Sequence, residues 1–226
     1  EMFPPGGPVK TQVIGKVTDK KLEQAQRVQD FMNYQVTQEI PDYFNELDQM
    51  LFYLALAGSA FKKVYFDNTL DRICSKFVPA EDFVISMENT DLETAERYTQ
   101  IMKLTRNDIR KYQISGVYRD IPLTKSEAGG SGSNNDGDMV EQTIQRLEGM
   151  SPSMADKIHT ILEVHTNLDL GEDKNELALP YIVTIDYESQ QVLSIRRNWK
   201  EEDTLRRKRT YFIHYKYLPG LGFYGF

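Results

Sequence analysis

The sequence predicts an α+β fold, in which N-terminal helices pack on mainly antiparallel strands. Apolar residues first recur at spacings of three and four, as they do along one face of a helix. β-branched and aromatic runs of strand length then follow, separated by polar turns. The 226 residues are 40% hydrophobic and 27% charged, which is typical of an ordinary globular protein with a core of its own. This length fits one large domain or a domain with a subdomain.

Composition excludes several classes of protein. The formal net charge of −7 argues against a protein that binds nucleic-acid phosphates tightly over its whole surface. The one cysteine, Cys74, excludes an internal disulfide. No apolar run approaches the roughly 20 residues that cross a bilayer, so we expect no membrane as a partner.

Two helices are predicted in the first quarter of the chain, after an extended leading segment at residues 1–18 that starts with prolines and glycines. The first helix should have Asp19 as its N-cap and should end near Ile40, because the residue before Pro41 is pushed out of the helical region. Its apolar positions are Leu22, Ala25, Val28, Met32 and Val36.

The second helix should carry Pro41 in its first turn and end at Gly58, which suits a left-handed C-terminal cap. Its apolar residues cover more than one face: they are Phe44, Leu47, Leu51, Phe52, Leu54, Ala55 and Leu56, with Tyr53 among them. We therefore expect this helix to be buried on more than one side.

The strands are expected where β-branched and aromatic residues cluster. The ranges are 61–66, 73–78, a corner with a short strand at 79–85, 97–104, 158–170, 179–186, 192–195 and 211–217. Thr105 and Asp108 have the spacing of a capping box and should open a short helix through Tyr112. The glycine- and serine-rich composition of residues 127–138 predicts a flexible insertion. A helix is predicted at residues 140–147.

The last residues, 218–226, are aromatic and glycine-rich, which is poor material for a free chain end. They predict a surface against which they pack, and they indicate that the chain is a piece of a longer protein.

No catalytic, cofactor-binding or metal-binding residues are expected. His159, His165 and His214 do not have the spacing of metal ligands, so each is interpreted as a structural residue. Cys74 has no CxxC partner and falls in a predicted strand, where a core position is expected. Carboxylates are numerous, but those at residues 81–96 and 169–173 fall mostly in predicted loops. A hydrolase that uses two carboxylates, with residues 127–138 as a flexible lid, remains the alternative function.

Positive charge gathers around one predicted loop, from Arg196 to Arg209. The basic residues considered for contact with DNA or with a neighbouring subunit are Arg196, Arg197, Arg206, Arg207, Lys208 and Arg209. The simpler interpretation is an exposed loop with internal ion pairs, because Glu201, Glu202 and Asp203 interrupt the cluster. Trp199 beside the loop could pack on a strand or stack on a base.

Two stretches resemble portal proteins, the head-to-tail connectors of short-tailed bacteriophages and related prophages. The first is residues 51–66, a helix that ends on Ala-Gly-Ser-Ala and enters a strand, followed by the VPAEDF corner at residues 78–83. The second is Arg-Arg-Asn-Trp at residues 196–199, leading to the His-Tyr-Lys-Tyr-Leu-Pro-Gly run from His214. The similarity extends from Gln38 to Phe226, apart from the insertion, and its motifs are structural rather than catalytic.

The resemblance implies that residues 19–226 form a wing-like α+β domain of a ring protein, usually a dodecamer, at the capsid vertex of the virion. In that family, double-stranded DNA passes through the ring during packaging and ejection, and terminase, capsid and tail-adaptor proteins bind to it. The portal itself hydrolyses nothing and assembles in the host cytoplasm. The stem, clip and crown are absent from this chain, so a monomeric fragment is compatible with the resemblance.

A third possibility is a stand-alone nucleic-acid-binding module. It predicts salt-dependent affinity of the isolated chain for DNA. An acidic chain suits a conduit better, because tight binding of phosphates would hold the DNA in place.

Overall fold

The structure is a computed structural model, and it describes residues 4, 7–67, 70–86, 88–122, 158–171, 177–218, 220 and 223–224. The expected insertion at residues 127–138 and the expected helix at 140–147 lie outside the described residues. Within the described residues, helices combine with sheets in which every strand pair is antiparallel. The predicted α+β class is therefore confirmed.

The chain forms two compact units. The first comprises Glu1–Glu81, Met87–Glu93 and Thr210–Phe226, and the second comprises Asp82–Ser86 and Thr94–Arg209. Each unit has its own antiparallel sheet.

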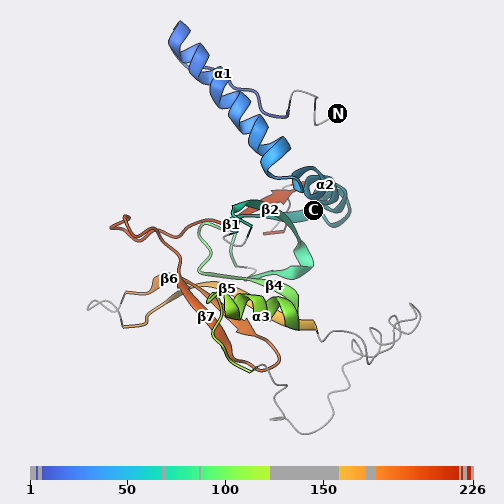
Figure 1. Ribbon diagram of the computed structural model, residues 1–226, viewed down its shortest axis with the longest axis vertical. Coiled ribbons are helices and arrows are strands. Elements are labelled where there is room, and N and C mark those ends of the chain that lie inside the picture. Colours follow the sequence, from blue (N-terminus) through green and yellow to red (C-terminus); the bar gives the residue numbers. More distant parts are fainter. Residues whose placement is uncertain are drawn as a thin grey trace, which may run out of the picture. The chain divides into compact units, whose positions relative to one another are not determined.

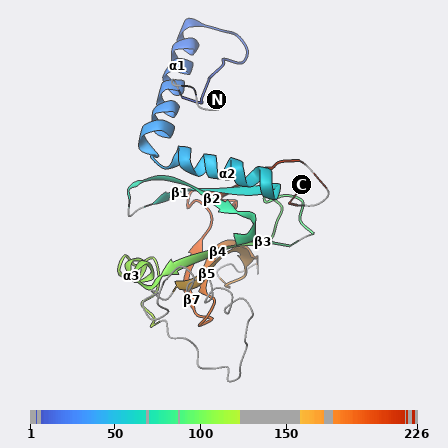
Figure 2. The same cartoon turned by 90° about the vertical axis from the view of Figure 1, so that its right-hand side faces the viewer.

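Within the described residues, the first unit consists of two helices and a three-stranded sheet with the order β2-β1-β8. Figure 1 labels α1, α2, β1 and β2 of this unit. Its helical elements are α1 (Asp19–Tyr34), the π-helical turn η1 (Gln35–Glu39) that continues it, and α2 (Tyr43–Ala57). Its strands are β1 (Ser59–Asp67), β2 (Arg72–Pro79) and β8 (Phe212–Lys216). Figure 2 shows α2 lying along this sheet, with α1 leaving the start of α2 at a steep angle.

The N-cap of helix α1 lies one residue earlier than predicted. Thr18, with extended φ and ψ of −134° and 153°, is the N-cap, and Asp19 is the first helical residue. An aspartate in the first turn still stabilises the helix, because its charge opposes the positive end of the helix dipole. The helical run ends at Ile40, before Pro41, as predicted.

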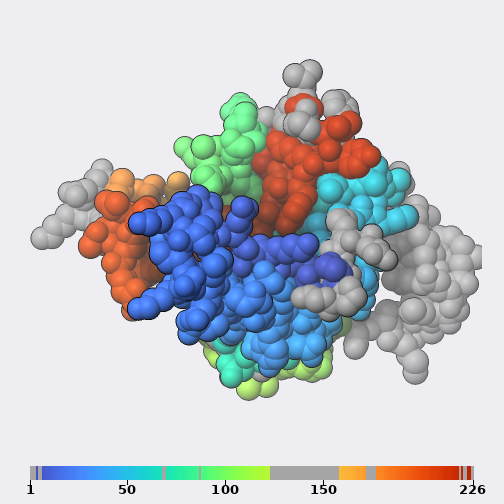
Figure 3. Space-filling model, turned by 90° about the horizontal axis from the view of Figure 1, so that it is seen from above, coloured from blue at the N-terminus to red at the C-terminus, as the bar shows by residue number. Residues whose placement is uncertain are grey.

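The leading segment lies against α1 (Figure 3), and hydrogen bonds join the two. The amide of Val9 donates to Oδ1 of Asn33 at 2.9 Å, and Nδ2 of Asn33 donates to the carbonyl of Val9 at 3.1 Å. Thr11 donates its hydroxyl to the carbonyl of Ala25 at 2.8 Å. Gly7 has a φ of +94°, and a Cβ at this position would lie 2.4 Å from Cγ of Asn33. This contact therefore requires glycine.

Helix α2 covers the sheet with one face only, which corrects the expected burial on several sides. Met50 is buried, whereas Phe52 and Leu56, four residues apart on the other face, are 77% and 78% exposed. The predicted C-terminus is confirmed, because Gly58 caps the helix with a left-handed φ of 75°.

The aromatic residues at the end of the chain find a partner in the first unit. Phe223 is 3% exposed and stacks on the rings of Phe61 and His214, at centroid distances of 5.9 and 4.4 Å. Phe61 on β1 is the register partner of His214 on β8, and their rings stack at 4.5 Å. Phe212 and His214 thus point to the same face of the sheet, because side chains two residues apart on a strand share a face.

The second unit is a five-stranded sheet with the order β3-β4-β5-β6-β7 and helix α3 packed on it. Its strands are β3 (Phe83–Ile85), β4 (Arg97–Thr105), β5 (Ile158–Leu168), β6 (Leu179–Asp186) and β7 (Val192–Arg197). A short 3-10 turn, η2 (Ala80–Asp82), precedes β3. The predicted strands are therefore present, with ends that differ by a few residues.

Helix α3 (Arg106–Ile114) begins with the predicted capping box. The amide of Asp108 donates to Oγ1 of Thr105 at 3.2 Å, and the Thr105 hydroxyl donates to Oδ2 of Asp108 at 2.7 Å. These bonds lower the pKa of Asp108, with Lys111 contributing. The helix and the turn after it pack on the sheet around a buried cluster of Ile109, Tyr118, Ile161 and Leu193.

Candidate functional site

The basic loop at residues 198–211 follows β7 and is held by its own backbone. The amide of Asn198 donates to the carbonyl of Pro180 on β6 at 3.0 Å, and the amide of Arg209 donates to the carbonyl of Asn198 at 2.9 Å. The two ends of the loop are thus tied to each other and to the sheet. Asn198 is 1% exposed, so the loop has a buried base.

Asp203 organises the middle of this loop. Its carboxylate accepts hydrogen bonds from the amides of Leu205 and Arg207, at 3.1 and 3.2 Å, and from Nε of Arg207 at 3.1 Å. Desolvation acts to raise the pKa of Asp203, but these bonds and the Arg207 charge outweigh it and lower the pKa. The carboxylate is therefore charged at neutral pH and fixes the turn.

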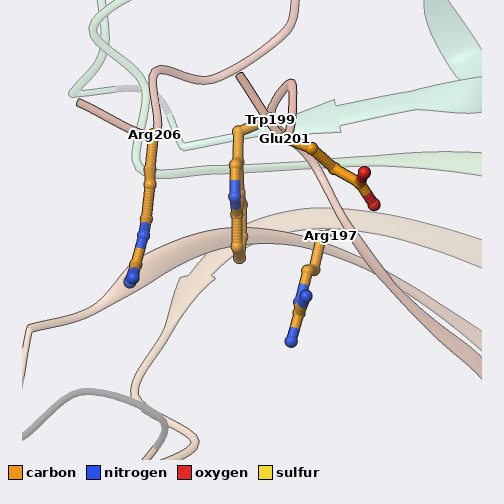
Figure 4. A pocket seen from close by; sticks show the side chains of 4 residues that line it. All are labelled: Arg197, Trp199, Glu201 and Arg206. Carbon is orange, nitrogen blue, oxygen red and sulfur yellow. The ribbon is translucent and has the colours of Figure 1, made fainter. Parts of the chain in front are cut away.

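The turn places Trp199 between two arginines. The guanidinium carbons of Arg197 and Arg206 lie 5.8 and 6.0 Å from the indole ring, which is within the range of cation–π attraction. Figure 4 shows the two arginines on opposite sides of Trp199, with all three side chains running in the same direction. The indole also contacts the Tyr181 ring in a T-shaped arrangement, at a centroid distance of 5.2 Å. We call Arg197, Trp199 and Arg206 the guanidinium–indole stack.

Arg206 occupies a backbone conformation that is uncommon for its residue type. Its φ is 49°, in the left-handed region that few residues other than glycine adopt. The amide of Arg206 donates to the carbonyl of Asp203 at 3.0 Å, which stabilises this conformation. Asp203 thus positions Arg206 as well as Arg207.

The stack lines an open depression with a volume of about 320 Å³. The described residues that line it are the three members of the stack and Glu201. The Glu201 carboxylate turns away from both guanidinium groups in Figure 4. The depression therefore has a positive end at the arginines and a negative end at Glu201.

The structure separates the six basic residues that the sequence grouped together. Arg197 and Arg206 meet at the depression, whereas Arg207 binds Asp203. Lys208 donates to the carbonyl of Ala95 at 3.0 Å and lies 5.3 Å from the Tyr98 ring, so it fastens the loop to the start of β4.

The two remaining basic residues have different surroundings. Arg196 and Arg197 are successive residues of β7 and point to opposite faces of the sheet. Nη2 of Arg196 lies 3.7 Å from Oε2 of Glu163. Arg209 is exposed, and its backbone amide closes the loop. Trp199 packs on Tyr181 and on the two arginines, as its structural interpretation predicted.

Sequence reasoning missed two buried histidine–carboxylate pairs in the five-stranded sheet. Nε2 of His165 lies 2.9 Å from Oε1 of Glu163, and Nδ1 of His159 lies 3.6 Å from Oδ1 of Asp186. His159, Glu163 and His165 are separated by even numbers of residues on β5, so they share one face of the sheet. That spacing was the signal that could have revealed them.

These pairs are part of the packed face of the sheet. The side chains of His165 and Asp186 are each 1% exposed, and the Ser189 hydroxyl also donates to Oδ2 of Asp186. Tyr118 lies over the same region, and burial, with help from Glu163 and Tyr112, raises its pKa, so it remains a neutral phenol. A substrate would have to displace this packing to reach the carboxylates.

The predicted loop carboxylates lie at the surface wherever the structure describes them. Residues 81, 88, 91, 93, 96 and 169 are exposed, and Asp82 is half-buried. Among the described residues, no group of three histidine, cysteine, aspartate or glutamate side chains could hold a metal ion. None of the helices in the described ranges is both long and apolar enough to cross a bilayer.

No protein-family model matches the chain, and a search of the curated proteins found no match.

Proposed function

We propose that this chain is the wing region of a bacteriophage portal protein and has a structural, non-catalytic role. In this role it would belong to a closed ring, with twelve copies as the expected number, at the capsid vertex of a virion. Double-stranded DNA would pass through the ring, while terminase, capsid and tail-adaptor proteins would bind other regions of the full-length subunit.

The proposal is supported by the two longest pieces of the resemblance, residues 51–66 and the run from His214, because both belong to the first unit. Residues 51–66 are the second half of α2, its Gly58 cap and most of β1. His214 to Phe226 begins in β8, which pairs with β1 in the same sheet. These two pieces thus correspond to neighbouring elements of the first unit, whereas the corner at residues 78–83 enters the second unit at Asp82 and residues 196–199 lie in the second unit.

The observation that carries the proposal is the apolar surface of the first unit. On α1, Val28, Phe31 and Met32 share one face and are 50%, 57% and 42% exposed. Phe52 and Leu56 on α2 are still more exposed. We call these two sets the exposed stripes of α1 and α2. Contiguous apolar surface of this kind is costly in water and marks sites of protein association.

A ring supplies a partner for such a surface in every subunit. In a cyclic ring, each subunit presents one patch to the subunit before it and a different patch to the subunit after it. Two dissimilar surfaces are therefore needed, and the exposed stripes could provide one of them.

The non-catalytic role is supported by the chemistry of the depression. Among the described residues, its lining consists of two arginines, a tryptophan and one carboxylate. A hydrolase that uses two carboxylates needs a facing pair, separated by about 5 to 10 Å, around the bond that is broken. The buried Glu163 and Asp186 are instead occupied by histidine partners within the sheet.

Native mass spectrometry tests the proposal on this chain and on a longer version that adds the stem region which the resemblance implies. A closed ring of the longer chain supports the portal-wing assignment, and a monomer of the present chain would then show that the stem region drives assembly. Monomers in both cases contradict it and favour screening for hydrolase activity.

A further inference from the structure

We infer that α1 of one copy of the chain packs on α2 of the next copy, so that the exposed stripe of α1 covers the exposed stripe of α2. This inference deepens the proposed ring and rests on it for the head-to-tail arrangement of the copies. It names the two surfaces that meet and the side chains that align them.

The first argument is that the two stripes do not cover each other within one chain. Both helices belong to the first unit, and α1 leaves the start of α2 at a steep angle (Figure 2). Val28 and Phe31 on α1 are 50% and 57% exposed, and Phe52 and Leu56 on α2 are 77% and 78% exposed. Each copy therefore presents two apolar surfaces of the same kind, and a second copy can cover either of them.

The second argument concerns shape. Phe52 and Leu56 follow Asp48 at intervals of four residues, so the three side chains form one ridge along α2. Arg27 and Phe31 have the same interval on α1. Ridges at this interval fit into the grooves of another helix in the commonest type of helix packing. The two helices can therefore interdigitate where these phenylalanines meet, which brings Arg27 close to Asp48.

The third argument is charge complementarity, and on α2 the charge is negative. The helix contains no lysine or arginine. Of its carboxylates, Glu46 is bound to β2, where Nζ of Lys76 donates to its Oε1 at 3.0 Å. Asp48 is exposed and lies one turn before Phe52. The stripe of α2 therefore has a negative flank.

The flank of the stripe on α1 is positive. Arg27 and Lys20, two turns apart on one side of the helix, are both exposed, and Arg27 lies one turn before Phe31. Glu23 and Asp30 lie beyond Arg27, farther from the stripe. Within the described residues, Arg27 donates to the carbonyl of Glu23 in its own helix, and it has no carboxylate partner. Its charge can therefore pair with a carboxylate of another copy.

This contact meets the geometric requirement of a ring. Each copy presents α1 to one neighbour and α2 to the other, so the two stripes supply both of the dissimilar surfaces rather than one. The apolar side chains supply most of the affinity, and the charges determine which helices meet and in which register.

The test is cysteine cross-linking of two variants of this chain with a short bismaleimide. One variant carries Arg27→Cys and the other carries Asp48→Cys, while the native Cys74 is buried. We expect a cross-linked dimer when the two variants are mixed, and less product, by about fivefold or more, from either variant alone, because unlike surfaces meet in a head-to-tail contact. The wild-type chain, in which Cys74 is the sole cysteine, should give no product.

Two further variants locate the contact. Gln26→Cys is exposed and points to a different side of α1 from Arg27, so it should react with the Asp48→Cys chain about fivefold more slowly than Arg27→Cys does. Phe52→Asp, added to the Asp48→Cys chain, places a charge in the stripe and should slow the reaction by about tenfold or more. Circular dichroism verifies that each variant is folded.

Three outcomes would overturn the inference. Equal product from one variant alone would indicate that like helices meet. Equal reaction of Gln26→Cys would indicate random collision, and the absence of product in every mixture would assign the stripes to a different protein.

The same cysteine pair in the longer chain separates this inference from the portal proposal. A closed ring that gives no cross-link between residues 27 and 48 would refute the helix contact and leave the portal proposal standing. A cross-link in a longer chain that forms no closed ring would contradict the portal proposal and retain the contact.

Discussion

The carboxylate of Asp203 binds both the backbone amide and the guanidinium of Arg207, at 3.2 and 3.1 Å. This contact fixes the turn from which Arg206 reaches Trp199. We expect Asp203→Asn to loosen the turn and to make Trp199 more accessible to acrylamide, measured as stronger quenching of its fluorescence. The free energy of unfolding should change little, because the contact is at the surface.

The pH dependence of this contact follows from the lowered pKa of Asp203. A carboxyl whose pKa is lower in the folded state stabilises that state above its unfolded pKa of 3.8, and the contribution is lost as the pH falls through the folded pKa. Quenching of the wild-type chain should therefore stay constant down to about pH 4. The control is Glu202→Gln, at the exposed neighbouring carboxylate. Equal quenching in both variants would contradict the role of Asp203.

Gly7 and Gly15 offer a matched pair of substitutions in the leading segment. Both have a positive φ, +94° and +93°, but only a Cβ at Gly7 would collide with Asn33. Gly7→Ala should therefore detach the segment from α1, whereas Gly15→Ala adds backbone strain alone. Hydrogen exchange of the Val9 amide should accelerate about tenfold or more in Gly7→Ala. Comparable exchange rates of the Val9 amide in the two variants would contradict this prediction, because they would mean that the segment accommodates the added Cβ at residue 7.

Lys62 is a buried cation on β1. It is 2% exposed, its Nζ lies 3.7 Å from the centroid of the Tyr43 ring, and among the described residues this nitrogen has no hydrogen-bond partner. Lys62→Met keeps the aliphatic stem and removes the charge. We expect the free energy of unfolding to rise by about 1 to 2 kcal/mol, because the cost of desolvating the ammonium exceeds the cation–π attraction. Urea unfolding measures this change.

The neighbouring Lys63, half-buried on the opposite face of β1, is the control, and Lys63→Met should have little effect. Burial lowers the pKa of Lys62, while Glu46 acts to raise it. Between the lowered pKa and 10.5 the unfolded chain binds more protons, so stability of the wild type should rise with pH in that window. Lys62→Met should lose this rise. A destabilised Lys62→Met variant would mean that the charge is favourable where it lies.

His214 gives the first unit a dependence on acidic pH. Its Nε2 lies 2.6 Å from the Ser59 hydroxyl, and its ring stacks on Phe61 and Phe223. Burial, and secondarily Lys216, lower the pKa of His214 to about 4, against a smaller opposing effect of Asp91. The folded state thus favours the neutral ring.

Stability should accordingly decline as the pH falls from about 6.5 towards 4, since the unfolded chain then binds a proton that the folded chain excludes. The loss should be on the order of 1 to 2 kcal/mol, reduced by solvent because the ring is only partly buried. His214→Phe keeps the stacking and should remove this component of the pH profile. Identical profiles for the two chains would assign the acid sensitivity elsewhere.

Elements with local signals were predicted well from the sequence. The capping box of Thr105 and Asp108 lies within four residues, and the left-handed cap at Gly58 depends on one residue. The β-branched and aromatic composition of runs such as β6 is sufficient to predict a strand. These features depend on neighbours in the chain, which a sequence shows directly.

Features set by distant contacts were not predicted. Phe52 and Leu56 have the composition of buried residues, but which faces of α2 are covered depends on the position of the sheet. The partner of Phe223 is Phe61 on β1, far away in the chain. The sequence likewise offered no way to distinguish the basic residues of the loop from one another. The fold of the loop shows that Arg206 lies beside Trp199, whereas Arg207 pairs with Asp203.

The central proposal is that the chain assembles into a ring through its exposed apolar surface. The most direct measurement is native mass spectrometry of the longer chain with and without Val28→Asp and Phe31→Asp in the stripe of α1. A matched control carries Gln24→Asp and Gln26→Asp, which change the net charge equally, at exposed polar positions of the same helix. The proposal predicts a closed ring for the unaltered chain and for the control, and smaller species for the stripe variant. Monomers throughout, or rings that the stripe substitutions leave intact, would contradict it.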